Sequence, residues 1–161
     1  MVVGSDAYGA VVEQILTGAN ASMGTIFVGV GRAALEHAVE YAKTRVQGGV
    51  PIIQHQSVKA RLFKMFVQVE AARSLSRRVA HYNATNPPLI QYSIASKVNS
   101  TNTAFEVASQ AIQIFGGNGL TRDFPVEKLM RDARASMIED GCNEVLSIKG
   151  GCYLIDEDRL R

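Results

Sequence analysis

Apolar residues recur at three- and four-residue spacings along most of this chain, a spacing typical of helices that bury one face. The first stripe comprises Ile26, Val30, Ala34, Ala38 and Tyr41, and two further stripes span residues 58–75 and 94–112. Few windows alternate with the period of a β-strand, and residues 1–4 are the one strand candidate. The pattern therefore predicts three long helices.

Glycine and proline clusters divide this helical pattern into segments. Breaks are predicted at residues 48–51 and 83–88, where paired glycines or consecutive prolines cannot continue a helix. The third stripe stops at the glycines at 116 and 117, and shorter helices are predicted at about residues 125–137 and 143–154. We therefore expect an all-α protein, an up-down four-helix bundle with an additional short helix.

Composition and charge exclude several classes of function. The chain has 161 residues and a net charge of +2, with basic and acidic residues interspersed, so we expect no nucleic-acid partner and no membrane surface. It has no apolar run of about 18 residues and no signal pattern at its start, so we expect a cytoplasmic protein. Cys142 and Cys152 have no ligand spacing with histidines, so no metal site is expected.

A glycine-rich turn, Gly116-Gly117-Asn118-Gly119, lies between two of the predicted helices. Glycine lets backbone N–H groups approach a ligand closely, so such a turn can bind phosphate. Most glycine-rich turns only connect helices, and the turn by itself leaves both interpretations open.

The residues around this turn resemble a known family. Residues 113–120, followed by residues 124–134 and then by Asp140 and Gly141, are similar to the C-terminal helical domain of the acyl-CoA dehydrogenase flavoproteins. Further motifs match in the same order at residues 31–36, at residues 41–45 and at the dipeptide of His55 and Gln56. The resemblance implies that residues 1–9 are the remnant of a connection from a preceding β-domain and that residues 10–161 form the helical bundle domain.

Members of this family catalyse α,β-dehydrogenation of acyl-CoA thioesters, in which a carboxylate removes the α-proton and the β-hydrogen leaves as hydride to the flavin. The resemblance implies that Asp140 is this base, where family members have a glutamate, and that Glu139 and Gly141 contact the substrate. The aspartate side chain is shorter by on the order of 1.5 Å, and a displacement of about that size can lower a rate a hundredfold. A cap on the following helix is an alternative role for Asp140, and Glu13 is a further candidate base.

The resemblance also implies FAD as the cofactor and assigns a set of residues to it. These residues are Arg45, Gln47, His55, Gln56, Gln113, Gly116, Gly117, Cys142 and Glu144. Those at 113–117 would contact the diphosphate of a cofactor held by the neighbouring subunit. Arg45 also suits the C-terminal end of a helix electrostatically, and His55 with Gln56 can cap the next helix, so structural roles stay open.

The partners implied by the resemblance are an acyl-CoA substrate, other copies of the chain in a homo-oligomer (dimer or tetramer), and an electron-transfer flavoprotein as electron acceptor. Val107, Ala111 and Ile114 would form an oligomer contact or belong to a buried central helix. Two alternatives stay open, namely a non-catalytic subunit or interaction module of a heteromeric dehydrogenase and a superfamily oxidase that uses aspartate as the base. The isolated domain lacks the family's other two domains and is expected to be inactive.

Overall fold

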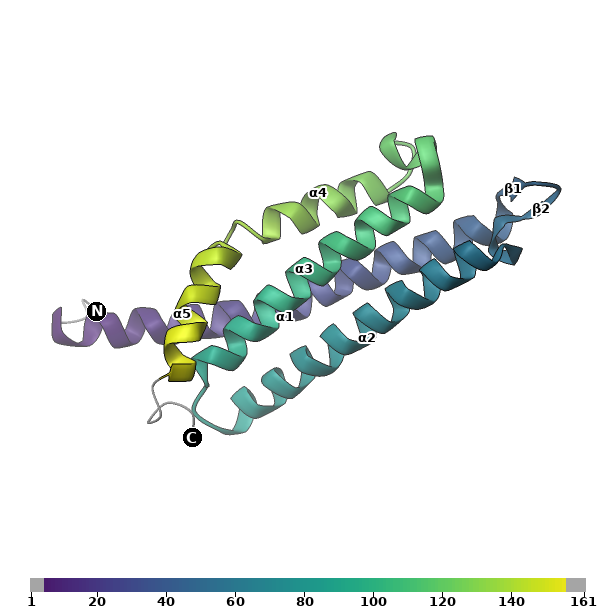
Figure 1. The fold of residues 1–161 in the computed structure, drawn as a ribbon. Coiled ribbons are helices and arrows are strands. Elements are labelled where there is room, and N and C mark those ends of the chain that lie inside the picture. Colours follow the sequence, from purple (N-terminus) through teal and green to yellow (C-terminus); the bar gives the residue numbers. More distant parts are fainter. Residues whose placement is uncertain (1–4, 156–161) are drawn as a thin grey trace.

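The computed structural model describes residues 5–155, and these form an all-α bundle, as the periodicity predicts. The three long helices are α1 (Ser5–Thr44), α2 (Gln56–Thr85) and α3 (Ile90–Phe115), and they run along the length of the molecule (Figure 1). Two shorter helices, α4 (Val126–Ser136) and α5 (Asn143–Ile155), return along α3. The predicted up-down bundle with an additional short helix is confirmed.

Helix α3 occupies the centre of the bundle and packs against each of the other four helices. Small side chains bring it close to α1: an ideal Cβ on Gly31 would lie 3.5 Å from the Cα of Ala104, and one on Gly24 would lie 3.0 Å from the carbonyl carbon of Ser96. Farther along the same pair of helices, one fully buried cluster contains Ala34, Ala38, Ala42, Val107, Ala108 and Ala111.

Two details of the predicted core are wrong. Ile26 is 57% exposed, and Met23 and Phe27 are buried in its place. From Ile26 to Ala38 the predicted stripe advanced by four residues at each step, whereas the contact face of a helix returns every 3.6 residues.

The second correction concerns Val107, Ala111 and Ile114, which were considered for an oligomer contact. All three are buried within the chain's own core. The alternative that α3 is a buried central helix is therefore confirmed.

The break between α1 and α2 contains a short hairpin that the sequence did not predict. Strands β1 (Val46–Gln47) and β2 (Val50–Pro51) pair antiparallel, and Gly48 (φ 62°) and Gly49 (φ 83°) form the turn between them. Positive φ at both turn residues matches the twist of a two-residue hairpin, and glycine adopts it without steric cost. A short 3-10 helix, Ile52–Gln54, then leads into α2.

The other predicted boundaries shift by a few residues. Helix α2 continues through Thr85, so the second break begins at Asn86 rather than at residue 83. Residues 5–9 are helical and belong to α1, and their role as a connection from a β-domain stays a prediction. The strand candidate at residues 1–4 lies outside the described residues.

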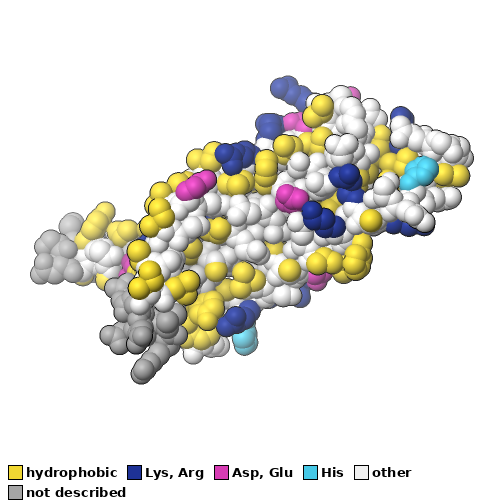
Figure 2. Space-filling model, viewed as in Figure 1, with side chains coloured by type: hydrophobic (Ala, Val, Ile, Leu, Met, Phe, Trp, Pro, Cys, Tyr) yellow, Lys and Arg dark blue, Asp and Glu magenta, His cyan; other side chains and the backbone are white. Residues whose placement is uncertain are grey.

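Surface composition is mixed. Figure 2 shows Lys and Arg scattered among acidic and hydrophobic side chains on the visible face. Between Ser5 and Ile155, no helix is both long and apolar enough to cross a membrane.

Candidate functional site

The turn between α4 and α5 places Asp140 at the surface of the bundle. After the end of α4, the backbone N–H groups of Ile138 and Glu139 donate to the Ala135 carbonyl oxygen at 2.9 Å and 3.0 Å. Asp140 then adopts a φ of 52°. This left-handed conformation costs most residues about 1–2 kcal/mol, but aspartate is among the residues that adopt it most readily. Aspartate at this position therefore suits the backbone of the turn.

Gly141 continues the turn with a φ of 91°, a value that other residues adopt only with strain. An ideal Cβ at this position would also lie 3.2 Å from the Leu146 side chain. The sequence pair of Asp140 and Gly141 is thus explained by backbone geometry alone, whatever its chemical role.

A buried lysine lies directly beneath this turn. Lys97, in the N-terminal third of α3, is fully buried, and its Nζ donates to the Gly141 carbonyl oxygen (2.8 Å) and to Asn143 Oδ1 (2.9 Å). Asn143 in turn donates from Nδ2 to Thr101 Oγ1 (3.0 Å) and to Asn102 Oδ1 (3.1 Å). The turn is therefore hydrogen-bonded to α3 on both sides of Cys142.

The electrostatics of this lysine reflect two opposed effects. Burial lowers the pKa of Lys97 below its usual 10.5, because the ammonium loses hydration. The nearby acidic groups of Asp140, Cys142, Glu139 and Glu144 act in the opposite direction and favour the charged form. Sequence reasoning missed Lys97, although it lies one helical turn before Thr101, which the third stripe includes.

Two alternatives for the acidic residues can be compared with this geometry. Helix α5 begins at Asn143, so Asp140 lies three residues ahead of it and not at its capping position. Glu13, the other candidate base, accepts a hydrogen bond from the Tyr153 hydroxyl and lies 3.6 Å from Lys149 Nζ, so it joins α1 to α5. Asp140 remains the better candidate for a base.

The residues assigned to the cofactor fall into two groups. Cys142 is half-buried and Glu144 is exposed, and both lie beside Asp140. The others lie away from this turn, at the end of the bundle formed by the β1–β2 hairpin and the end of α3 (Figure 1). One chain therefore does not bring all nine residues together.

At the hairpin end, three of the assigned residues, Gln47, His55 and Gln113, line one cavity of about 270 Å³. His55 Nε2 lies 3.1 Å from the Gln47 carbonyl oxygen, which joins the start of α2 to the hairpin. His55 occupies the capping position of α2 but makes no side-chain capping hydrogen bond, so the capping alternative is wrong for its side chain. Arg45 and Gln56 are exposed and lie next to these residues in the chain, outside the wall of the cavity.

The wall of the same cavity includes a positively charged side chain that sequence reasoning missed. Arg61, half-buried on α2, lines the wall and donates from Nη1 to Gln110 Oε1 of α3. Its position four residues after Ser57, another lining residue, places both on one face of α2. A guanidinium with further free N–H directions is a suitable group for phosphate.

The glycine turn comes shortly after Gln113, a residue of this cavity wall. Helix α3 ends at Phe115, and Gly116 has a φ of 62°, as predicted for glycine after a helix. Tyr41 of α1 holds the 3-10 helix η2 (Gly116–Leu120) in place. Its ring stacks on Phe115 with the ring centroids 4.0 Å apart, and its hydroxyl accepts a hydrogen bond from Asn118 Nδ2 at 3.0 Å. Gly116 and Gly117 are exposed, and an ideal Cβ on either would contact nothing within 4 Å. Their backbone is open to a ligand.

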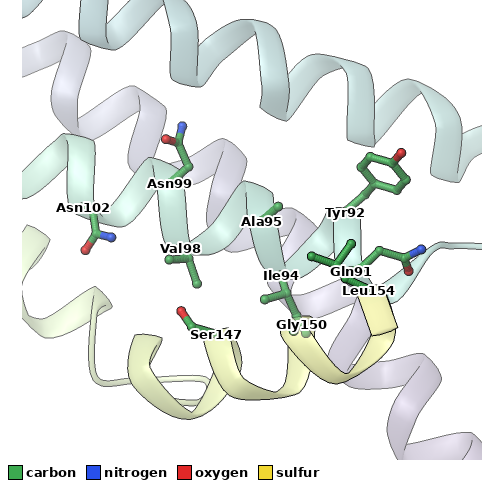
Figure 3. A pocket seen from close by; sticks show the side chains of 11 residues that line it. Gln91, Tyr92, Ile94, Ala95, Val98, Asn99, Asn102, Ser147, Gly150 and Leu154 are labelled. Carbon is green, nitrogen blue, oxygen red and sulfur yellow. The ribbon is translucent and has the colours of Figure 1, made fainter. Parts of the chain in front are cut away.

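A larger cavity of about 500 Å³ lies between α3 and α5. Figure 3 shows Ile94 and Val98 of α3 facing Ser147 and Gly150 of α5 across it. Its lining residues include no Asp, Glu, Lys, Arg or His, and Tyr92 is the one residue in the lining with an acid or base side chain. Among residues 5–155, no group of three potential ligands could hold a metal ion.

Comparison with known families gives a match of residues 9–149 to the acyl-CoA dehydrogenase C-terminal domain. The chain belongs to the acyl-CoA dehydrogenase family. The short-chain specific acyl-CoA dehydrogenase of Megasphaera elsdenii is 40% identical over 128 residues, covering 79% of this chain and 33% of that protein. An acyl-CoA dehydrogenase of Bacillus subtilis is 37% identical over 142 residues, covering 85% of this chain and 38% of that protein.

The fold of this acyl-CoA dehydrogenase domain agrees with solved structures. It superposes on butyryl-CoA dehydrogenase from Megasphaera elsdenii with a TM-score of 0.86 and 36% identity, over 89% of this chain and 37% of that one. The chain thus spans between 33% and 38% of the length of the curated relatives described above.

Proposed function

We propose that this chain provides the base for α-proton abstraction and part of the FAD site in an acyl-CoA dehydrogenase. The observation that carries the proposal is the Asp140 turn, which presents a carboxylate at the surface from a backbone that is hydrogen-bonded to the central helix. A base that acts on carbon must be held in one geometry, because small displacements lower the rate steeply. The hydrogen bonds of Lys97 to Gly141 and Asn143 support the proposal, because they hold the backbone next to Asp140.

In this proposal Asp140 accepts the α-proton of the acyl-CoA, while Glu139 and Gly141 flank the thioester. Bound FAD would accept the β-hydrogen as hydride. Asp140 is exposed in this chain, and an exposed carboxylate is a weak base toward carbon. Exclusion of water by the rest of the enzyme would strengthen it, because desolvation favours the protonated form of a carboxylate.

The hairpin cavity suits the anionic part of FAD. Arg61 and Gln113 offer N–H donors, and the exposed backbone at Gly116 and Gly117 leaves room for close approach. The cavity, at about 270 Å³, is slightly smaller than the usual size range of ligand pockets, so it would hold part of the cofactor.

The separation of the two groups supports a homo-oligomer in which the hairpin end of one copy completes the flavin site beside Asp140 of another. An apolar surface on α2 is available for such a contact. Its members are Phe63 (67% exposed), Phe66 (49%) and Val67 (49%). Exposed apolar groups in one patch are typical of protein interfaces.

The base can be tested in the flavin-loaded enzyme that contains this chain together with the other domains of the family. Anaerobic mixing with acyl-CoAs of several chain lengths, followed by flavin absorbance, measures the reductive half-reaction. Asp140→Asn should slow bleaching at least about a hundredfold, the range lost with a general base, while FAD content stays unchanged. The control is Asp132→Asn, which removes a carboxylate that pairs with Lys128 on α4 and should bleach normally.

Three other outcomes of this experiment would contradict the proposal. Normal bleaching in Asp140→Asn removes Asp140 from the mechanism. No bleaching by the unaltered enzyme with any thioester, despite bound FAD, favours the non-catalytic subunit. Peroxide formation on admission of oxygen favours the oxidase.

The cofactor contacts need a separate measurement. Arg61→Met should weaken FAD retention, measured by flavin fluorescence on dilution, whereas Lys59→Met, at an exposed position two residues earlier on α2, should not. Arg45→Ala in the same assay shows whether the residue implied by the family resemblance also contributes. Unchanged retention in both arginine variants would contradict the phosphate role of this end.

A further inference from the structure

Lys97 is an unusual residue for the centre of a helical bundle. It is fully buried, and a buried ammonium is strongly unfavourable unless it is hydrogen-bonded or paired. Replacement of buried ion pairs by apolar side chains is often neutral or stabilising. Its presence therefore suggests a function other than the overall stability of the bundle.

The hydrogen bonds of this lysine are directed at one short segment. Nζ donates to the carbonyl oxygen of Gly141 at 2.8 Å and to the side chain of Asn143 at 2.9 Å. The Gly141 carbonyl belongs to the residue directly after Asp140, and Asn143 N donates to Met137 O at 2.9 Å, which closes the turn across its base. The ammonium thus fixes the two ends of the segment that follows Asp140.

Aspartate and glycine adopt positive φ readily, but both can adopt other conformations as well, so contacts from outside the turn help to select this one. Asp140 (φ 52°) and Gly141 (φ 91°) are consecutive residues with positive φ, and backbone in this region persists when its surroundings determine it. Asn143 extends the contact by donating to Thr101 and Asn102 of α3.

We infer that Lys97 is a positioning residue for the carboxylate turn, because its hydrogen bonds to Gly141 and Asn143 set the direction in which the Asp140 side chain leaves the backbone. The catalytic consequence rests on the proposed function of Asp140, whereas the structural effect does not. The two are therefore tested by different measurements.

The structural test is amide hydrogen exchange on the 161-residue chain with Lys97→Met, which keeps a long side chain and removes the donors. The amides of Ile138, Glu139 and Asn143 are hydrogen-bonded within the turn. Their exchange should accelerate by about tenfold or more, the effect expected from the loss of a charge-assisted hydrogen bond, while the amides of α2 keep their protection. The control Lys128→Met, an exposed lysine of α4, should leave the turn unchanged.

A second variant keeps the inference testable if Lys97→Met folds poorly. Asn143→Leu removes the acceptor and leaves the lysine in place, and it should also accelerate exchange within the turn. The double variant should accelerate exchange by less than the product of the two single accelerations, because both substitutions disrupt one network. Unchanged exchange in the turn, an equal acceleration throughout the bundle, or fully independent effects would each overturn the positioning role.

The catalytic consequence is measured in the flavin-loaded enzyme. Lys97→Met should reduce the rate of flavin bleaching at saturating acyl-CoA with FAD content unchanged, and Lys128→Met should not. If Asp140→Asn bleaches normally while turn exchange still accelerates in Lys97→Met, the proposed base is wrong and the positioning role stands. If Asp140→Asn is inactive but turn exchange is unchanged in Lys97→Met, the proposed base stands and the positioning role is wrong.

Discussion

Gly119→Ala should destabilise the glycine turn by introducing a methyl group where there is no room. An ideal Cβ at Gly119 would lie 2.9 Å from the Cβ of Phe115 and 3.0 Å from both the Cα and the carbonyl oxygen of Ile112. The last two are backbone atoms of α3, so no side-chain rotation relieves the contact. Overpacking of this kind costs about 1–3 kcal/mol, which for a chain of this size corresponds to a melting temperature lower by roughly 2 to 12 °C.

Urea denaturation followed by circular dichroism measures this difference, and Gly117→Ala is the matched control two residues away. Nothing lies within 4 Å of an ideal Cβ at Gly117, and its φ is not among the positive values of the described residues. Alanine is compatible with such a position and should change stability by no more than about 1 kcal/mol, in the stabilising direction.

Equal effects of the two substitutions would refute the reasoning, because they would mean that the close approach of η2 to α3 does not exist in solution. A further reading comes from FAD retention in the loaded enzyme. A turn displaced in Gly119→Ala should hold the cofactor less well, whereas Gly117→Ala tests whether an added methyl on the exposed backbone itself obstructs a ligand.

Three further predictions concern packing and pH. Gly24→Ala should lower the unfolding free energy in urea by about 1–3 kcal/mol, because its methyl would overlap a serine of α3, whereas Gly29→Ala, with nothing within 4 Å, should raise it by up to about 1 kcal/mol. The hydrogen bond from Arg131 lowers the pKa of Glu127 below its usual 4.5. The contribution of Glu127 to stability is therefore fully present above pH 4.5 and is lost as the pH falls through the lower pKa of the folded state. Glu127→Gln should therefore flatten the acid limb of a plot of melting temperature against pH. Burial lowers the pKa of Lys97 below 10.5, so the unfolded chain binds more protons just below that pH, and the contribution of Lys97 to stability rises with pH in this window. Lys97→Met should remove that rise, and an unchanged alkaline limb would contradict it.

The helices could be predicted because their burial is periodic. Along α2, Leu62, Met65 and Val69 are buried as the stripe indicates, and exposed residues fill the opposite face. Likewise, a glycine pair after an apolar stripe indicated the end of α3 at Phe115. Local chemistry decides both features, and local chemistry is readable in a sequence.

The site depended more on contacts between distant segments. Lys97 and Arg61 resemble ordinary solvated helix positions in the sequence, and only the packing of other elements over them shows otherwise. A central helix packs against several neighbours and exposes only part of its surface, so periodicity alone does not tell which of its polar residues face water. The meeting of Gln47 and His55 with Gln113 in one cavity likewise comes from the packing of α2 on α3. That these residues bind FAD, and that Asp140 is a base, stay predictions.

The small side chains between α1 and α3 have a consequence for conformational entropy. Glycine and alanine lose no rotamer freedom on burial, so the contact through Ala34, Ala38 and Ala108 orders almost nothing beyond the backbone. A buried lysine, in contrast, loses up to about 2 kcal/mol of rotamer freedom. The contact between α1 and α3 thus orders few side chains, whereas Lys97, the residue that holds the turn of Asp140, carries one of the larger side-chain ordering costs in the core.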